Sequence, residues 1–365
     1  MTNTPTTPDL FDLTIIGGGP TGLFAAYYAG VRHLKTKILD SLEELGGQLT
    51  TLYPEKYIFD VPGFPKIYAR DLANNLLEQA LQYNPAICLG ETVARLDTLE
   101  PPNSPSLPTP PLHAPGIPAP LPAPPHYCIT TDKARHYTKT ILICAGVGAF
   151  QAKKLPLPDA NPLEGRGVYY FVKSKAVFTN HRLLIVGGGD SAVDWALNLH
   201  DVAADITLIH RRNQFRAHED SVRKLLASRV RVLTFWELKT LQSADGRLRG
   251  AVIVNNQTKE ERTLELDSIL VQVGFVSSLG PIRNWPVKIS GSGILVDSHM
   301  ETNLPGIFAA GDVASYDGKL KLIATGFGEA ATAVNYAKTR VDPAARLFPG
   351  HSSEMTPQPN TVITL

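Results

Sequence analysis

The sequence has 365 residues, of which 43% are hydrophobic and 19% are charged, and its formal net charge is +1. This length exceeds one compact core and fits two domains, while the apolar content excludes a disordered chain. A net charge so close to zero gives no sign of a nucleic-acid-binding protein.

The cysteines and the first residues indicate a reducing compartment. Cys88, Cys128 and Cys144 form no close pair, and an odd number excludes a fully paired disulfide scaffold. Residues 1–12 lack a basic segment followed by an apolar run, so we expect no secretory signal. No run of about 18 apolar residues exists, so we expect no membrane span. Together these features predict a cytoplasmic protein.

The first predicted unit is a strand, a glycine-rich turn, a helix and a second strand. The apolar run 10–16 precedes the turn, residues 23–29 are helix-like, and residues 36–40 form the second strand. The turn supplies Gly17, Gly19, Thr21 and Gly22. Glycines at this spacing allow a tight turn, the approach of a pyrophosphate and close packing of helix on strand. The pattern therefore predicts a dinucleotide-binding unit.

The residue that ends the second strand indicates which dinucleotide binds. In the first unit this residue is Asp40. A carboxylate at this place accepts hydrogen bonds from ribose hydroxyls and repels a 2′-phosphate. The first unit is therefore expected to bind FAD or NAD.

Residues 101–125 interrupt two strand-like stretches, 91–96 and 126–130. Nearly half of this segment is proline, and none of it is charged. Proline at this density prevents helix and does not donate to a sheet, so the segment is expected to be extended. We interpret it as an insertion at the tip of a hairpin. A tolerated surface loop and a proline-rich ligand for a partner domain both remain open.

A second unit repeats the pattern in the other half of the chain. The strand-like run 182–186 leads into Gly187, Gly189 and Ser191, and the second strand spans residues 205–210. At the place that corresponds to Asp40 this unit has a histidine, and no carboxylate is present. The residues expected to bind the nucleotide's extra phosphate are His210, Arg211, Arg212 and Arg216. Guanidinium groups bind phosphate through charge-assisted hydrogen bonds, so the second unit is predicted to prefer NADP(H).

A third feature is the apolar strand 305–310, which ends in Gly311-Asp312. An acid at the end of a buried strand commonly faces a ligand crevice, although an ordinary turn aspartate explains it equally well.

The charge is divided unevenly along the chain. Residues 166–283 contain 17 Lys and Arg against 12 Asp and Glu, a net +5, and the remainder carries −4. A positive domain attracts acidic partners and speeds their encounter. Candidate residues for such a face are Arg223, Lys224, Arg229 and Arg231. A role of part of this charge in binding the NADP phosphates and in solubility explains it equally well.

Beyond the glycine turns, the sequence resembles the ferredoxin–NADP+ reductases of the thioredoxin-reductase-like type, a bacterial family of flavoenzymes. The resemblance runs from about residue 12 to residue 351, apart from the proline-rich segment. The stretches that carry it are 46–49, 52–57, 60–61, 63–65, 187–195, 210–218, 274–281, 310–312 and 326–330.

The resemblance implies positions for FAD and NADPH. Asp40 is expected to hold the FAD ribose, and Asp312 the ribityl or pyrophosphate part. Gln48 is expected near the isoalloxazine, which Tyr53 stacks on. Val93 and Phe150 are expected to border the FAD. His351 and Ser353, in a C-terminal segment of the partner subunit of a homodimer, are expected at the opposite face of the flavin ring. No metal and no certain catalytic side chain are implied.

Thioredoxin reductase shares both units but needs a Cys-x-x-Cys pair upstream of the second glycine turn. Here Phe171 and Ser174 occupy those positions, which disfavours a dithiol relay. The predicted function is electron transfer between NADPH and ferredoxin or flavodoxin, by hydride transfer to the flavin and then single-electron steps. The alternatives are an NADPH diaphorase with another acceptor and an NADPH-binding redox sensor.

The predicted fold class is α/β, with two Rossmann-like, three-layer dinucleotide-binding domains of the thioredoxin reductase type. The FAD-binding domain is expected to comprise residues 1–165 and 285–365, with the insertion at 101–125. The NADPH-binding domain is expected to span residues 166–284, between the two parts of the first.

Overall fold

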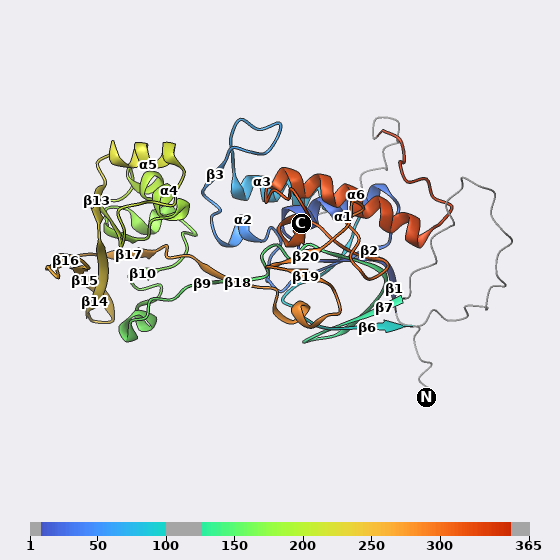
Figure 1. The fold of residues 1–365 in the computed structure, drawn as a ribbon, viewed down its shortest axis with the longest axis horizontal. Helices are drawn as coiled ribbons and strands as arrows, with labels where there is room; N and C mark the ends of the chain where they lie inside the picture. Colours follow the sequence, from blue (N-terminus) through green and yellow to red (C-terminus); the bar gives the residue numbers. More distant parts are fainter. Residues whose placement is uncertain (1–8, 100–125, 352–365) are drawn as a thin grey trace. The chain divides into compact units, whose positions relative to one another are not determined.

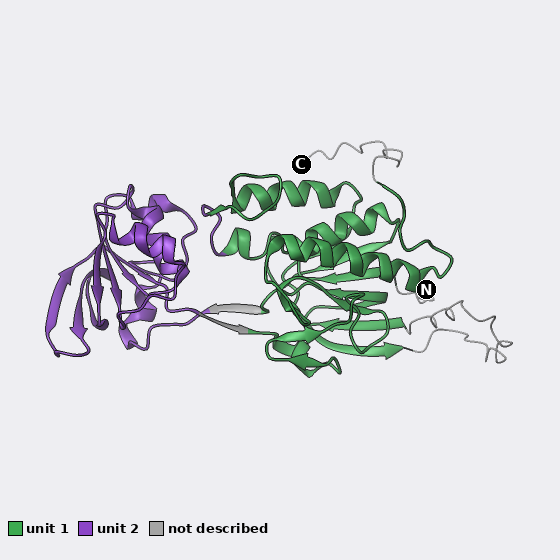
Figure 2. Cartoon of the chain, turned by 45° about the horizontal axis from the view of Figure 1, so that its top comes forward, with its two compact units in different colours: residues 1–51, 57–149, 278–365 green, residues 52–56, 150–277 purple. Residues whose placement is uncertain are grey.

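The computed structural model describes residues 9–99 and 126–351, which form two compact units. Unit 1 comprises the described parts of Met1–Thr51, Tyr57–Ala149 and Ser278–Leu365, and unit 2 comprises Leu52–Lys56 and Phe150–Ser277 (Figure 2). The first unit is therefore discontinuous in sequence.

Unit 1 is built on a seven-stranded sheet with the order β5-β2-β1-β8-β7-β6, in which β21 also pairs with β8. Strand β1 runs parallel to β2 and β8, whereas β6, β7 and β8 are antiparallel. The strands of the sheet are β1 (Leu10–Ile16), β2 (Thr36–Leu39), β5 (Ala86–Cys88), β6 (Val93–Leu99), β7 (His126–Thr131), β8 (Arg135–Ile143) and β21 (Ile307–Ala309).

Three long helices of unit 1 lie over one face of this sheet (Figure 1). They are α1 (Pro20–Val31), α3 (Ala69–Leu81) and α6 (Ile323–Val341). Helix α1 packs against both α3 and α6. The shorter elements of the unit are α2 (Gln48–Thr51), β3 (Tyr57–Ile58), β4 (Ile67–Tyr68), η3 (Gly280–Asn284), β19 (Ile289–Ser290), β20 (Gly293–Leu295), η4 (Gly311–Val313) and β22 (Ala314–Ser315).

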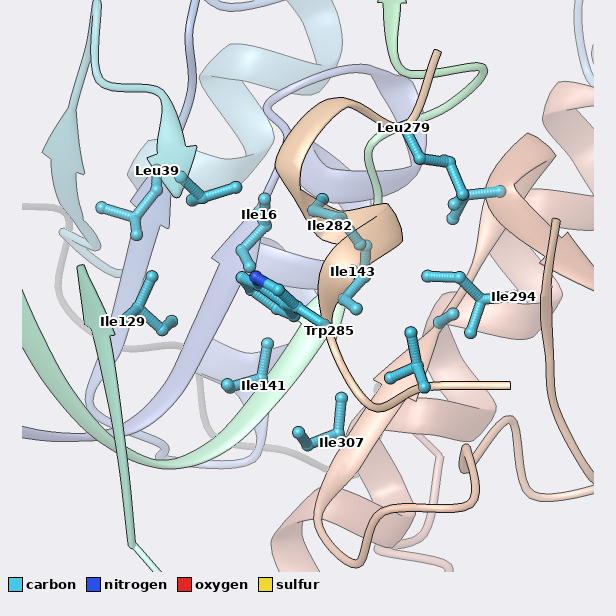
Figure 3. Packing of buried hydrophobic residues seen from close by; sticks show 14 of the residues in the cluster. Ile16, Leu39, Ile129, Ile141, Ile143, Leu279, Ile282, Trp285, Ile294 and Ile307 are labelled. Carbon is cyan, nitrogen blue, oxygen red and sulfur yellow. The ribbon is translucent and has the colours of Figure 1, made fainter. Parts of the chain in front are cut away.

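The core of unit 1 joins segments that are far apart in sequence. Trp285 is 5% exposed and lies among Ile16, Ile141 and Ile143 (Figure 3). Its indole Nε1–H donates to the Ala94 carbonyl at 3.4 Å. A parallel strand that is covered on both faces is rich in apolar residues along its whole length. Residues 10–16, which form β1, have this pattern.

Unit 2 has a five-stranded parallel sheet with the order β10-β17-β11-β12-β13 and a three-stranded antiparallel sheet β14-β15-β16. Its elements are β10 (Val168–Tyr169), β11 (Arg182–Val186), α4 (Asp190–Leu199), β12 (Asp205–His210), α5 (Glu219–Leu226), β13 (Arg231–Thr234), β14 (Trp236–Ala244), β15 (Arg247–Asn255), β16 (Glu261–Glu265), β17 (Ser268–Val271), η1 (Pro158–Leu163) and η2 (Lys175–Phe178). Separate hydrophobic clusters involve α4 and the β14–β15 pair, so the parallel sheet is the middle of three layers. The predicted α/β class with two β-α-β units is confirmed.

The boundaries of the units differ from the predicted 166–284. Ala152, Leu155 and Leu163 belong to a hydrophobic cluster of unit 2, so the main segment of unit 2 begins at Phe150. At the other end, Leu279 and Ile282 join the core of unit 1. Strands β9 (Ala149–Ala152) and β18 (Phe275–Ser278) pair where the chain passes from one unit to the other.

The proline-rich stretch joins the two strands of a hairpin, as predicted. Strands β6 and β7 are antiparallel, and Leu99 pairs with His126. The expected extended conformation of residues 101–125 concerns residues outside the described part of the chain.

Candidate functional site

The glycine turn of unit 1 has no room for side chains at two of its predicted positions. Gly17 has φ +105°, and a Cβ there would lie 2.4 Å from the Cys144 carbonyl oxygen. A Cβ on Gly22 would lie 1.9 Å from the Gly17 carbonyl oxygen. Helix α1 begins directly after Gly19, which provides no side-chain cap. Its first N–H groups are therefore placed to receive an anion such as a pyrophosphate.

Asp40, at the end of β2, is fixed against this turn. It is 8% exposed. One carboxylate oxygen accepts the Gly18 N–H at 2.6 Å, and the other accepts the Leu42 N–H at 2.8 Å. Burial raises the pKa of Asp40, and these backbone donors partly oppose that shift. Each oxygen retains a lone pair, so the carboxylate has the capacity to accept further hydrogen bonds from hydroxyl groups.

Gln48 begins α2 beside the same turn. The Gly46 N–H donates to the Gly18 carbonyl at 2.8 Å. A Cβ on Gly47 would lie 2.9 Å from the Gly19 Cα, and one on Gly146 would lie 3.6 Å from Gln48 Nε2. Three segments that are distant in sequence therefore meet at the start of α1.

Asp312 follows a glycine, Gly311, that packs against Thr21 in the first turn of α1. Gly311 has φ +78°, and Cβ atoms on Gly311 and Gly326 would lie 2.8 Å and 2.4 Å from Thr21 Oγ1. Burial raises the pKa of Asp312, and nearby lysines partly oppose this. No group in residues 9–99 or 126–351 hydrogen-bonds to the Asp312 carboxylate. A half-buried carboxylate left in this way fits a hydroxyl-bearing ligand such as the ribityl chain of FAD.

For the remaining residues predicted to contact FAD, the described contacts do not include the glycine turn of unit 1. Val93 is 7% exposed and belongs to the hydrophobic core of unit 1. Phe150 lies in β9, and its side chain is outside what the structure describes, as is the whole of Ser353. His351 is exposed, and its ring lies 5.4 Å from that of Phe348.

Tyr53 was expected at the flavin, yet residues Leu52–Lys56 belong to unit 2. The Tyr53 side chain packs on the cluster that contains Val172 and Trp195. Lys56 pairs with Asp194 on α4. The neighbouring Glu55 carboxylate accepts the Lys175 N–H at 2.7 Å. Nothing in the local sequence indicates these attachments, since the partners lie far along the chain.

The glycine turn of unit 2 repeats the geometry of the first. Gly187 has φ +156°, and a Cβ there would lie 2.3 Å from the Gln272 carbonyl oxygen. Helix α4 begins after Gly189, which again provides no side-chain cap. Ser191 lies in the first turn of α4 and is half-buried. This second helix terminus also offers unpaired N–H groups to a phosphate.

His210 and the residues after it frame this turn. A Cβ on Gly188 would lie 2.3 Å from the His210 ring. The His210 Nε2–H donates to the Gln214 carbonyl at 3.0 Å, and the Arg216 N–H donates to the Gly188 carbonyl at 2.8 Å. Burial and the three neighbouring arginines lower the pKa of His210.

The side chains of Arg211, Arg212 and Arg216 are exposed. None of the described carboxylates forms an ion pair with them. Three guanidinium groups without acidic partners, next to a phosphate-binding turn, fit a nucleotide that carries a 2′-phosphate.

Glu329 is a residue of the first site to which sequence reasoning assigned no role. It is 5% exposed on α6, and its carboxylate accepts the Gly311 N–H at 2.7 Å. Its only sequence signal is its place in the stretch 326–330, where a glutamate on a helix is expected at the surface.

Neither unit contains a redox dithiol. The three cysteines, Cys88, Cys128 and Cys144, are free. Ser174 caps η2 by accepting the Ala176 N–H. Burial raises the pKa of the Cys144 thiol, so it stays protonated. In the described part of the chain, no three His, Cys, Asp or Glu side chains form a metal-binding group. None of the helices described there is long and apolar enough to cross a membrane.

Comparison with known proteins agrees with this geometry. The family described as pyridine nucleotide-disulphide oxidoreductase matches residues 11–336. The crystal structure of Lactococcus lactis thioredoxin reductase superposes with a TM-score of 0.71 at 27% identity, covering 91% of this chain and 99% of that one. The chain therefore belongs to the pyridine nucleotide-disulphide oxidoreductase family and has the two-domain thioredoxin reductase fold.

Curated relatives narrow the assignment. The ferredoxin–NADP reductase of Thermus thermophilus is 49% identical over 95% of this chain and 97% of its own length. That of Halalkalibacterium halodurans is 49% identical over 95% of this chain and 98% of its own. Within the larger family, this chain thus belongs with the ferredoxin–NADP reductases. This membership confirms the prediction of an oxidoreductase that uses FAD and NADPH.

Proposed function

We propose that this enzyme transfers electrons between NADPH and ferredoxin by way of FAD. The observation that carries the proposal is the opposite charge at the two nucleotide turns. Asp40 stands beside the first turn, whereas His210 and unpaired arginines stand beside the second. Of the candidate nucleotides, only NADP(H) carries a 2′-phosphate. The carboxylate beside the turn of unit 1 would repel this phosphate, and the arginines beside the turn of unit 2 would bind it.

Unit 1 would hold FAD. The start of α1 binds the pyrophosphate, Asp40 accepts from the ribose, and Asp312 accepts from the ribityl or pyrophosphate part. Gln48, which begins α2 beside the same turn, would lie near the isoalloxazine. When bound, FAD supplies the exchange between two-electron and one-electron chemistry that joins a nicotinamide to a one-electron carrier.

Unit 2 would hold NADPH. The start of α4 binds the pyrophosphate, and Ser191 lies in its first turn. Arg211, Arg212 and Arg216 bind the 2′-phosphate. His210 packs on Gly188 and holds the turn in shape, and burial together with the neighbouring arginines lowers its pKa, which favours the neutral ring.

The carrier would dock on the positive surface of unit 2. Arg223 and Lys224 on α5 share a single carboxylate, that of Asp220. Arg231 lies 3.9 Å from Asp205, and Arg229 donates to the Ala203 carbonyl. This excess of positive charge attracts an acidic carrier, and flavodoxin would satisfy it as ferredoxin does.

The enzyme would act as a homodimer in the cytoplasm. A buried arginine, Arg32, donates to the carbonyls of Arg346 and Leu347 and thereby holds the segment that carries exposed Phe348 and His351. A tail presented in this way is available to a second subunit, where His351 and Ser353 would face the flavin opposite Tyr53. Free cysteines fit a reducing compartment. Light scattering of the purified protein measures the dimer.

Anaerobic mixing of the purified protein with NADPH, followed by ferredoxin, tests the function. The expected result is loss of the visible absorption band of oxidised flavin on adding NADPH and its return on adding ferredoxin. If NADPH bleaches the flavin band and no soluble carrier restores it, a redox sensor is favoured. If only artificial acceptors restore the band, a diaphorase is favoured. If NADPH does not bleach the band, the proposal is refuted.

A further inference from the structure

Glu329 is a buried carboxylate with three donors around it, all from the segment that follows β21. Its Oε2 accepts the Gly311 N–H at 2.7 Å. Its Oε1 accepts the Tyr316 hydroxyl at 2.6 Å and also pairs with Lys319. The side chains of Glu329 and Lys319 are 5% and 7% exposed. One helical side chain thus binds the beginning, the middle and the end of residues 311–319.

The segment that Glu329 holds is the one that carries Asp312. Gly311 has the left-handed φ of +78°, and a Cβ there would meet Thr21 Oγ1 at 2.8 Å. The turn is therefore confined between α6 and the start of α1. The Asp312 carboxylate leaves this turn with no hydrogen-bond partner among the described residues.

The stability of unit 1 does not by itself explain why the ion pair of Glu329 with Lys319 is buried. Removing two charges from water costs several kcal/mol, which their attraction repays only in part, so a buried ion pair is weak evidence for stability. A second buried pair in the same unit, Arg340 with Glu301, ties α6 to the loop before β21. The Glu301 carboxylate also accepts a backbone N–H, that of Gly306, at 2.6 Å. The two glutamates are thus alike in burial and partners but differ in what they hold.

We propose that Glu329 is a positioning residue of the FAD site, which fixes the Gly311 turn so that Asp312 meets the cofactor in one orientation. This inference rests on the proposed function, since it requires FAD in unit 1. Glu329 acts through Gly311 and does not itself contact the cofactor. Its hydrogen bond to Gly311 orients the turn, and Tyr316 and Lys319 orient the carboxylate.

The Tyr316 hydroxyl remains a hydrogen-bond donor to Glu329. Burial and the Glu329 carboxylate raise the pKa of Tyr316 to about 12. The Lys319 ammonium lies 5.6 Å from the centre of the Tyr316 ring, which adds a cation–π contact. These contacts hold the Tyr316 ring and its hydroxyl in place beside Glu329.

The test compares Glu329→Gln with the matched control Glu301→Gln. Both variants keep the shape of the side chain and remove a buried charge in unit 1. Apoprotein of each is titrated with FAD, and the visible circular dichroism of the bound flavin and the thermal midpoint are recorded. Binding of 2′,5′-ADP, which probes unit 2, is measured in the same preparations.

Glu329→Gln is expected to raise the Kd for FAD by at least about tenfold, the effect of losing about 1.4 kcal/mol of binding energy. It is also expected to change the circular dichroism of bound flavin. Glu301→Gln is expected to lower the thermal midpoint while its Kd for FAD stays within about twofold of wild type. Affinity for 2′,5′-ADP is unchanged in both.

Equal FAD affinity of Glu329→Gln and wild type would overturn the inference, and so would an equal loss in both variants. If Glu329→Gln does not fold, Lys319→Met and Tyr316→Phe replace it. Each keeps the Gly311 hydrogen bond, so a smaller rise in the Kd for FAD of about threefold is expected, and an unchanged Kd would refute the proposal. Wild-type protein without affinity for FAD would instead refute the proposed function.

Discussion

The two nucleotide units use the same backbone geometry and opposite side-chain chemistry. In both, a parallel strand ends at a glycine with positive φ, and a helix without a side-chain cap begins shortly after it. The residue at the end of the second strand differs in charge: Asp40 follows β2 in unit 1, whereas His210 ends β12 in unit 2. From this comparison we expect the glycine turn to accept either dinucleotide and the residue at the strand end to select between them.

The largest expected effect is on stability and FAD content when glycines of the first turn are replaced. It distinguishes a glycine required for packing from one required for binding the ligand. Gly22→Ala places a Cβ 1.9 Å from the Gly17 carbonyl oxygen. We therefore expect the free energy of unfolding to fall by about 1–3 kcal/mol. We also expect the variant to lose bound FAD. The nearest atom to a Cβ on Gly19 is the Gly47 Cα at 4.0 Å. Gly19→Ala should therefore keep the stability of the apoprotein and lose FAD. Urea unfolding and flavin content check this, and equal behaviour of the two variants would contradict it.

The next effect concerns the arginines of unit 2. Arg211→Ala combined with Arg212→Ala should raise the KM for NADPH far more than that for NADH, because each lost charged hydrogen bond costs about 1.5–3 kcal/mol. Steady-state kinetics with both nucleotides measures it. Arg247→Ala removes an exposed arginine on β15, to which no role is assigned, and serves as the control. An equal rise for both nucleotides would remove these residues from the phosphate site.

A smaller effect is expected at Tyr53. The ring packs within unit 2, whereas the family resemblance places it on the flavin. Tyr53→Ala should alter the absorption spectrum or retention of FAD, since a stacked aromatic excludes water from the ring. Tyr53→Phe should preserve both. An unchanged spectrum with full FAD occupancy in Tyr53→Ala would assign the residue to unit 2 alone.

The smallest effect is a pH dependence of unit 2. The folded-state pKa of His210 lies below its ordinary value of 6.5, so the folded state binds this proton less readily than the unfolded state. The corresponding stability is present above pH 6.5 and is lost as the pH falls through the folded-state pKa. His210→Gln should flatten this part of the curve in thermal unfolding followed from mildly alkaline to mildly acid pH. Parallel curves for variant and wild type would contradict the assignment.

Local patterns sufficed for the β-α-β units, because the turn, the helix start and the strand-end residue lie close together in sequence. They did not suffice where packing joins distant segments. The assignment of Leu155 to unit 2 and of Leu279 to unit 1 depends on which core buries them. The ion pair of Lys56 with Asp194 and the hydrogen bond of Glu329 to Gly311 each join residues that are brought together only by folding.

The most direct measurement of the central claim is calorimetric titration of the FAD-loaded protein with 2′,5′-ADP and with 5′-AMP. These ligands differ in the 2′-phosphate and share the adenosine part. If the arginines of unit 2 select NADP(H), 2′,5′-ADP binds at least about tenfold more tightly, and the difference shrinks as salt is added. Equal affinity for the two ligands would contradict the claim that charge at the strand ends divides the nucleotides between the two units.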